Sequence, residues 1–181
     1  MSSSEKTKWA IDPSHSKVAF KVKHLMIANV QGNFREFEGA VATEGDDFST
    51  AKISFSLNAS SIDTDIADRD AHLKSADFFD SEKYPKITFA GNGLKDLGDD
   101  LFELTGELTI KDVTKPVTLS VEYGGIMADP WGNVKSGFSI NGKIKRKDFG
   151  LNWNAALEAG GVLVGEEVKI SGDLELVKLA S

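Results

Sequence analysis

The sequence predicts an all-β fold, an eight-stranded antiparallel barrel with a short helix packed over it. Apolar residues recur at every second position in one segment after another, so each strand has one apolar and one polar face, which is typical of antiparallel sheets. Turn-forming residues separate these segments, as at Gly45-Asp46-Asp47, Gly98-Asp99-Asp100 and Gly132-Asn133, because Gly, Asn and Asp tolerate positive φ. Eight such strands in mostly sequential order close most simply into a barrel, which also removes exposed sheet edges.

The alternating segments define the expected strands. They cover residues 17–24, 33–44, 50–58, 86–93, 101–110, 116–124, 135–147 and 167–178, with a short additional strand at 8–12. In the first of them, Val18, Phe20 and Val22 share one face and lysines occupy the other. Several segments reach ten residues or more, which is long for the alternative architecture, an immunoglobulin-like sandwich.

The longest interruption between strands, residues 60–82, is expected to hold the one convincing helix. Asp65 with Asp68 three residues later forms a weak capping box, and acidic residues in a first turn suit the helix dipole. Ile66, Leu73 and Ala76 are expected to share an apolar stripe against the barrel. Shorter turns are expected at 25–31 and 154–160, and all these segments would cover one mouth of the barrel.

Length and composition agree with a single domain at residues 8–181, preceded by a tail at residues 1–7. The chain carries 28 acidic and 21 basic residues, a formal net charge of −7, which is unfavourable for nucleic acid or an anionic membrane. The absence of cysteine excludes disulfides, thiol catalysis and Cys-ligated metals. No apolar run is long enough for a spanning helix, and the first nine residues lack the apolar stretch of a secretory signal, so a soluble, cytoplasmic chain is expected.

The barrel interior is open to two interpretations. Eight strands enclose a space that is either filled by side chains or holds one small or elongated ligand. Inward positions include Gly39, Gly106, Gly142 and Gly172, which leave room for a ligand but equally relieve tight bending of the strands.

Catalytic and metal-binding patterns are weak. His15, His24 and His72 could together hold a zinc ion, but they lack a ligand spacing motif, and structural histidines bonded to backbone or carboxylate are favoured; for His72 the candidate is Asp68. No phosphate-binding loop and no nucleophile–base pair is recognisable, so neither an enzyme nor a cofactor is predicted. Arg146 is in phase with the inward residues, and either an anionic head group or an acid such as Asp148 is expected to pair with it.

A series of short motifs, in order along nearly the whole chain, resembles the YceI-like family of bacterial lipid-binding proteins. The motifs are Trp9-Ala-Ile-Asp-Pro-Ser-His-Ser16, Val18-Ala-Phe20 with His24, Gly32-Asn-Phe34, Ser61-Ile-Asp-Thr64, His72-Leu-Lys-Ser-Ala-Asp-Phe-Phe-Asp80, Tyr84-Pro-Lys-Ile-Thr-Phe89, Gly106-Glu-Leu-Thr-Ile110, Val113-Thr-Lys-Pro-Val117 and Arg146-Lys-Asp-Phe-Gly150. The resemblance implies a lipocalin-like barrel around a long apolar tunnel for polyisoprenoids, isoprenoid quinones or similar amphiphiles. It implies no catalytic residue set. Members are often exported, and this chain departs from them in lacking a recognisable leader.

The predicted function is therefore non-catalytic binding of an elongated apolar molecule for storage, transport or sequestration. The partners expected are a long-chain isoprenoid or another apolar small molecule, without nucleic acid or stable membrane insertion, and a homodimer is compatible with the sequence. A histidine-based metal enzyme and a filled-barrel structural or interaction module are the alternatives. The residues expected to contact the ligand are those of the inward faces and strand ends: Val18, Phe20, Val22, His24, Phe37, Ile53, Phe55, Leu57, Ile87, Phe89, Leu104, Leu108, Leu119, Val121, Phe138, Ile140, Ile144, Arg146, Ile170 and Leu174.

Overall fold

The computed structural model describes residues 6–25, 27–154 and 164–180, which form mainly β-strands. The strands are β1 (Lys6–Ile11), β2 (Lys17–His24), β3 (Ala28–Phe34), β4 (Phe37–Glu44), β5 (Asp47–Asn58), β6 (Ile62–Asp63), β7 (Lys86–Asn92), β8 (Lys95–Gly98), β9 (Leu101–Ile110), β10 (Val113–Ala128), β11 (Val134–Lys145) and β12 (Val164–Lys178). The α-helix is α1 (Ala67–Lys74), and the 3-10 turns are η1 (Pro13–His15), η2 (Ala59–Ser61) and η3 (Arg146–Phe149). In the described parts of the chain, no helix has the length and apolar character needed to cross a membrane.

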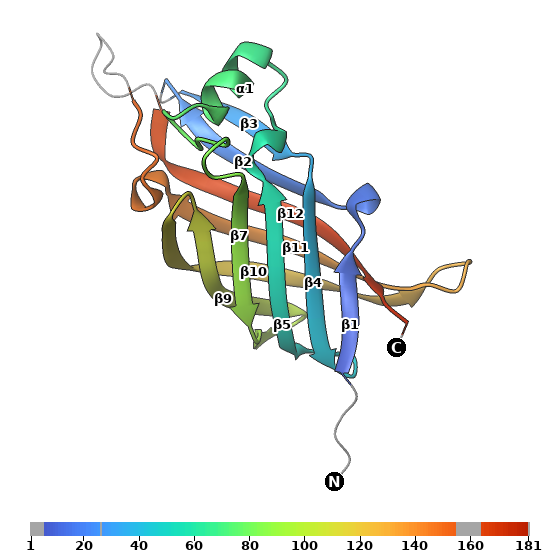
Figure 1. The fold of residues 1–181 in the computed structure, drawn as a ribbon. Coiled ribbons are helices and arrows are strands. Elements are labelled where there is room, and N and C mark those ends of the chain that lie inside the picture. Colours follow the sequence, from blue (N-terminus) through green and yellow to red (C-terminus); the bar gives the residue numbers. More distant parts are fainter. Residues whose placement is uncertain (1–5, 26, 155–163, 181) are drawn as a thin grey trace.

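The sheet closes into an eight-stranded antiparallel barrel, as predicted. The hydrogen-bonded order is β1-β4-β5-β7-β9-β10-β11-β12, and β12 returns to β1 (Figure 1). Closure depends on β12, which pairs with β11 on one side and changes partner on the other. Its residues 164–173 pair with β2, and its residues 176–178 pair with β1. The short N-terminal strand is therefore a wall of the barrel and not an addition to it, and it begins two residues earlier than predicted.

Two strands continue the sheet beyond β2, and here the prediction was wrong. β3 pairs with β2, and β6 pairs with β3, so the turn expected at 25–31 is mostly strand. The strand expected at 33–44 is divided at Arg35 and Glu36, where the chain leaves β3 for β4. Backbone bonds to neighbouring segments fix this corner: the Arg35 amide donates to Ser61 O over 3.1 Å, and the Asn58 amide donates to Glu36 O over 3.0 Å.

The helix is shorter than predicted and begins differently. Its N-cap residue is Ile66, which offers no side-chain cap, while Asp65 has a positive φ of 68° that breaks the helical path. The Asp70 carboxylate accepts hydrogen bonds from the Thr64 amide and hydroxyl, over 2.8 and 2.5 Å. These bonds tie the first turn to the segment before it, so the capping box predicted at Asp65 is not formed.

Figure 1 shows α1 over one end of the barrel, and the Leu73 side chain of this helix packs on the core. Ala76, placed on the same stripe by the prediction, is exposed and lies beyond the end of the helix. The turn predicted at 154–160 lies outside the described residues except for Asn154.

Inward glycines make room for neighbouring side chains. A Cβ at Gly142 would lie 2.3 Å from Leu119 Cδ2, and one at Gly106 would lie 2.4 Å from Phe89 Cζ. A Cβ at Gly39 would likewise meet Ile11 Cδ1 at 2.5 Å. Because neighbours already occupy the space that these glycines leave, strand glycine does not by itself produce the cavity described below.

Candidate functional site: the barrel cavity

The barrel encloses a cavity of about 660 Å³ with an almost entirely apolar lining. All the residues predicted to contact a ligand line it except Phe37. β2 contributes Val18, Phe20, Val22 and His24; β5 contributes Ile53, Phe55 and Leu57; β7 contributes Ile87 and Phe89; β9 contributes Leu104 and Leu108; β10 contributes Leu119 and Val121; β11 contributes Phe138, Ile140 and Ile144; η3 contributes Arg146; and β12 contributes Ile170 and Leu174. Phe37 instead stacks on Phe55, with ring centroids 6.2 Å apart. Contact of any of these side chains with a ligand stays a prediction.

Aromatic side chains that the strand alternation did not indicate also line the cavity: Phe34, Phe48, Phe78, Phe79 and Trp153. Phe48 lies at the irregular start of β5, where the register with β4 shifts, so it is out of phase with the inward residues that follow. The centroid of its ring lies 5.0 Å from that of Trp9 and 4.8 Å from that of Phe138. Phe78 and Trp153 lie outside regular strands, so a period of two could not have identified them.

The charged and imidazole side chains of the lining come from the end of β2, from α1 and from η3: Lys23, His24, Asp68, Arg69, His72 and Arg146. Among the strand residues of the wall, Ser54 and Ser171 are the polar additions. Ile66, which precedes α1, lines the cavity and is also 51% exposed, so the cavity reaches the surface beside this helix. One end of the cavity is therefore bordered by charged and imidazole groups, whereas its walls are hydrocarbon. Such a site can enclose an apolar chain and leave a polar group near α1.

Two of these polar groups are held by the protein itself. Arg69 donates to Thr64 Oγ1 and to the Thr64 carbonyl, over 2.8 and 2.7 Å. His72 Nε2 lies 2.9 Å from a carboxylate oxygen of Asp77, and its ring meets Trp153 edge-on at 4.7 Å. A carboxylate does orient His72, but it belongs to Asp77 and not to the predicted Asp68.

Arg146 is buried and bonded to backbone carbonyls, which corrects the predicted pair with Asp148. Nη1 donates to the carbonyls of Leu151 and Trp153 over 2.6 and 2.8 Å. Nε donates to the Gly165 carbonyl over 2.8 Å, and Nη2 reaches the Val164 carbonyl at 3.3 Å. Burial lowers the pKa of this guanidinium, against the opposing charge of Glu166. Because most of its donors are engaged, Arg146 joins the end of β11 to the start of β12.

The three histidines do not come together. His24 and His72 line the cavity, whereas His15 lies in η1 beside Asp12 and Glu175. Of the described residues, only Asp12, His15 and Glu175 place three metal-ligating atoms within 4.8 Å of one another. The zinc site considered for His15, His24 and His72 is therefore not assembled.

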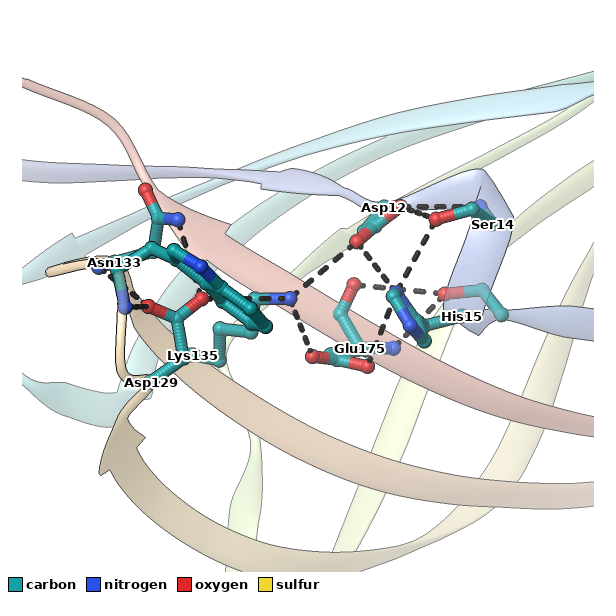
Figure 2. A network of polar contacts seen from close by, with 9 residues as sticks. Asp12, Ser14, His15, Asp129, Asn133, Lys135 and Glu175 are labelled. Atoms are coloured by element: carbon teal, nitrogen blue, oxygen red, sulfur yellow. Dashed lines mark hydrogen bonds and ion pairs between the residues drawn. The ribbon is translucent and has the colours of Figure 1, made fainter.

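The group around His15 belongs to a polar network that already contains a cation. Lys135 Nζ lies 3.0 Å from Glu175, 3.6 Å from Asp12 and 3.8 Å from Asp129 (Figure 2). The bond to Glu175 raises the pKa of Lys135, and hydrogen bonds from Ser14 and His15 hold the pKa of Asp12 well below its usual range. The network links η1, β12 and the β10–β11 hairpin.

Comparison with known proteins agrees with this architecture. The family model described as YceI-like domain matches residues 9–176. A UPF0312 protein of Staphylococcus aureus is 39% identical over 170 residues, covering 93% of this chain and 96% of that protein.

Solved structures share the fold. The YCEI protein of Campylobacter jejuni superposes with a TM-score of 0.72 at 31% identity, covering 89% of this chain and 91% of that one. BcnA of Burkholderia cenocepacia has a TM-score of 0.79 at 24% identity (91% and 98% covered), and a polyisoprenoid binding domain from Saccharophagus degradans has 0.68 at 15% (94% and 98% covered). Barrel, cavity and sequence matches together place this chain in the YceI-like domain family.

Proposed function

We propose that this protein binds one elongated apolar molecule inside the barrel, without chemical conversion, for storage, transport or sequestration. The cavity carries the proposal: about 660 Å³ of enclosed space lies within the usual range for ligand sites and is walled by hydrocarbon side chains. A polyisoprenoid, the tail of an isoprenoid quinone or a long acyl chain has the matching chemistry. The polyisoprenoid binding domain from Saccharophagus degradans, which has the same fold, supports the first of these ligands.

Burial of the chain would dominate the affinity. Each buried methylene group contributes about 0.8 kcal/mol, so ten of them contribute roughly 8 kcal/mol before the costs of ordering are subtracted. A net binding free energy of that size corresponds to a dissociation constant of about 1 μM, so further methylene groups must be buried to offset the ordering costs. The polar groups near α1 would orient the ligand and contribute less to its retention.

Organic extraction of the protein purified from its own host, followed by mass spectrometry, tests the proposal. A long-chain isoprenoid or acyl species near one per barrel is expected. Phe55→Asp and Ile140→Asp should each abolish the signal because they place a carboxylate in the apolar wall. Lys52→Glu, on the outer face of β5, is the matched control and should retain the ligand.

A folding measurement accompanies each variant, since a buried carboxylate can unfold the barrel. Far-ultraviolet circular dichroism and a cooperative urea transition are required before an empty extract is interpreted. If the folded wild-type protein yields an empty extract and binds no apolar fluorescent probe, the proposal is wrong, and the barrel is an interaction module.

A further inference from the structure

Five lysines are grouped on the outer surface of β2, β12 and β11, at the end where β2 reaches the polar lining of the cavity. This lysine face consists of Lys21, Lys23, Lys143, Lys145 and Lys169. Lys169 lies directly opposite Lys21 on one side and Lys143 on the other, so three lysines form a row across three neighbouring strands. The three residues of this row line one groove on the outside of the barrel, together with Lys17 and the carboxylates of Asp63, Asp65 and Asp173.

The charges of this face are only partly compensated, because Glu167 lies directly opposite Lys145 on the neighbouring strand. Lys143 approaches Glu167 only to 3.8 Å. The other four lysines form no ion pair within the part of the chain that the structure describes. Like charges directly opposite one another destabilise a sheet. Although the chain has a net charge of −7, it places lysines opposite one another, where their repulsion lowers the stability of the sheet. A bound anionic partner would offset this repulsion.

Exposed apolar side chains lie beside the lysine face. In the connection from β2 to β3, Ile27 is 84% exposed and Leu25 is 40% exposed. Leu25 also has a φ of 55°, a left-handed conformation that a large apolar side chain rarely adopts. Lys23 and His24, the last residues of β2, line the cavity and directly precede this connection.

We propose that this end of the barrel docks peripherally on an anionic lipid bilayer, with the lysine face against the headgroups and Leu25 and Ile27 in the interface. Basic residues combined with apolar side chains are what such binding requires. The net charge of −7 disfavours an anionic surface, but screening over about 8 Å at physiological salt reduces its effect, so the charges of the local face dominate the contact. The proposal builds on the proposed function by giving the ligand a source next to the polar end of the cavity.

Cosedimentation with vesicles tests the docking. The wild-type protein is expected to bind phosphatidylcholine vesicles that contain phosphatidylglycerol, to ignore pure phosphatidylcholine vesicles, and to dissociate as salt is raised. Lys21→Glu/Lys169→Glu should weaken binding at least tenfold, since each basic residue near such a surface contributes roughly a fivefold increase in affinity. Ile27→Ser should also weaken it, by removing an inserted side chain.

Lys8→Glu/Lys52→Glu is the matched control, because it makes the same charge change at exposed positions on β1 and β5 and should bind as the wild type does. Both double variants are checked for ligand by extraction, so docking and ligand binding are scored separately. Equal binding of the two double variants, or a wild type that binds polyphosphate but not anionic vesicles, overturns the proposal. Loss of docking with retained ligand would leave the proposed function intact.

Discussion

The guanidinium of Arg146 donates hydrogen bonds to backbone carbonyls near the end of β11 and the start of β12, in place of water. Arg146→Met keeps the apolar stem but leaves the carbonyls of Leu151, Trp153 and Gly165 without this donor. We expect the free energy of unfolding to fall by about 3 kcal/mol, since unsatisfied buried polar groups cost roughly 1–3 kcal/mol each. Urea denaturation measures the change. The neighbouring exposed Lys147→Met should shift the midpoint little, and equal effects at both positions would contradict the assigned role.

Asp12 makes stability depend on pH in the acid range. Hydrogen bonds from Ser14 and His15 hold its pKa below the usual range in the folded protein. A group with a depressed folded pKa stabilises the protein above its unfolded pKa, about 3.9 for Asp, and loses that contribution as the pH falls through the folded value.

Asp12→Asn should therefore be less stable than the wild type at pH 7, and the difference should shrink as the pH falls below about 4. Urea midpoints at pH 7, 4 and 3 test this expectation. A constant difference across this range would show that the charge of Asp12 is not what stabilises η1.

Among the elements, β10 and β11 show how an inward glycine and a large neighbour fit each other. Gly142→Ala forces its Cβ against Leu119 and should destabilise the protein by about 1–3 kcal/mol. In a Leu119→Ala background the same substitution should cost much less, because the clashing atoms are gone. A double-mutant cycle by urea denaturation measures this coupling. Additive effects would contradict the packing described here.

The sequence predicted long strands well and short elements poorly. Alternation in β9 and β10 survives over ten or more residues, so the inward face is unambiguous. β3 contains Asn, Gln and Gly, which have low strand propensity, and it becomes a strand because it pairs with β2 along its length. The predicted helical stripe ran too far, to Ala76, because Ser75 takes an extended backbone at the C-cap. The capping box was wrong because Asp65 takes a positive φ, a local geometry that periodicity does not contain.

For the whole molecule, β12 is the strand on which closure depends, because it is hydrogen-bonded on both sides along most of its length. Hydrogen exchange followed by mass spectrometry should find its amides among the slowest to exchange. β8, which pairs with β9 alone and is exposed throughout, should exchange orders of magnitude faster. Similar rates in the two strands would show that the barrel opens at β12.

The cavity-lining residues could be predicted where they lie on strands with a regular alternation of apolar and polar residues. Val18, Phe55 and Leu108 were identified because they alternate with polar neighbours. Trp153 and Phe78 were missed because loops and turns bring them to the cavity. The lysine face was also missed. Its lysines come together through the pairing register of β2, β12 and β11, and the sequence of a single strand does not determine that register.

The first and last strands of the barrel are neighbours, and this makes the chain almost circular. Trp9 lies opposite Lys178, and the Leu179 amide donates to the Lys8 carbonyl over 2.8 Å. A short loop between these ends would be one more hairpin turn. New ends could open at the β4–β5 turn, where Gly45 has open space around it. Every strand of such a circular permutant would keep the neighbours that it has now, so the order in which the strands are synthesised is separable from their arrangement in the barrel.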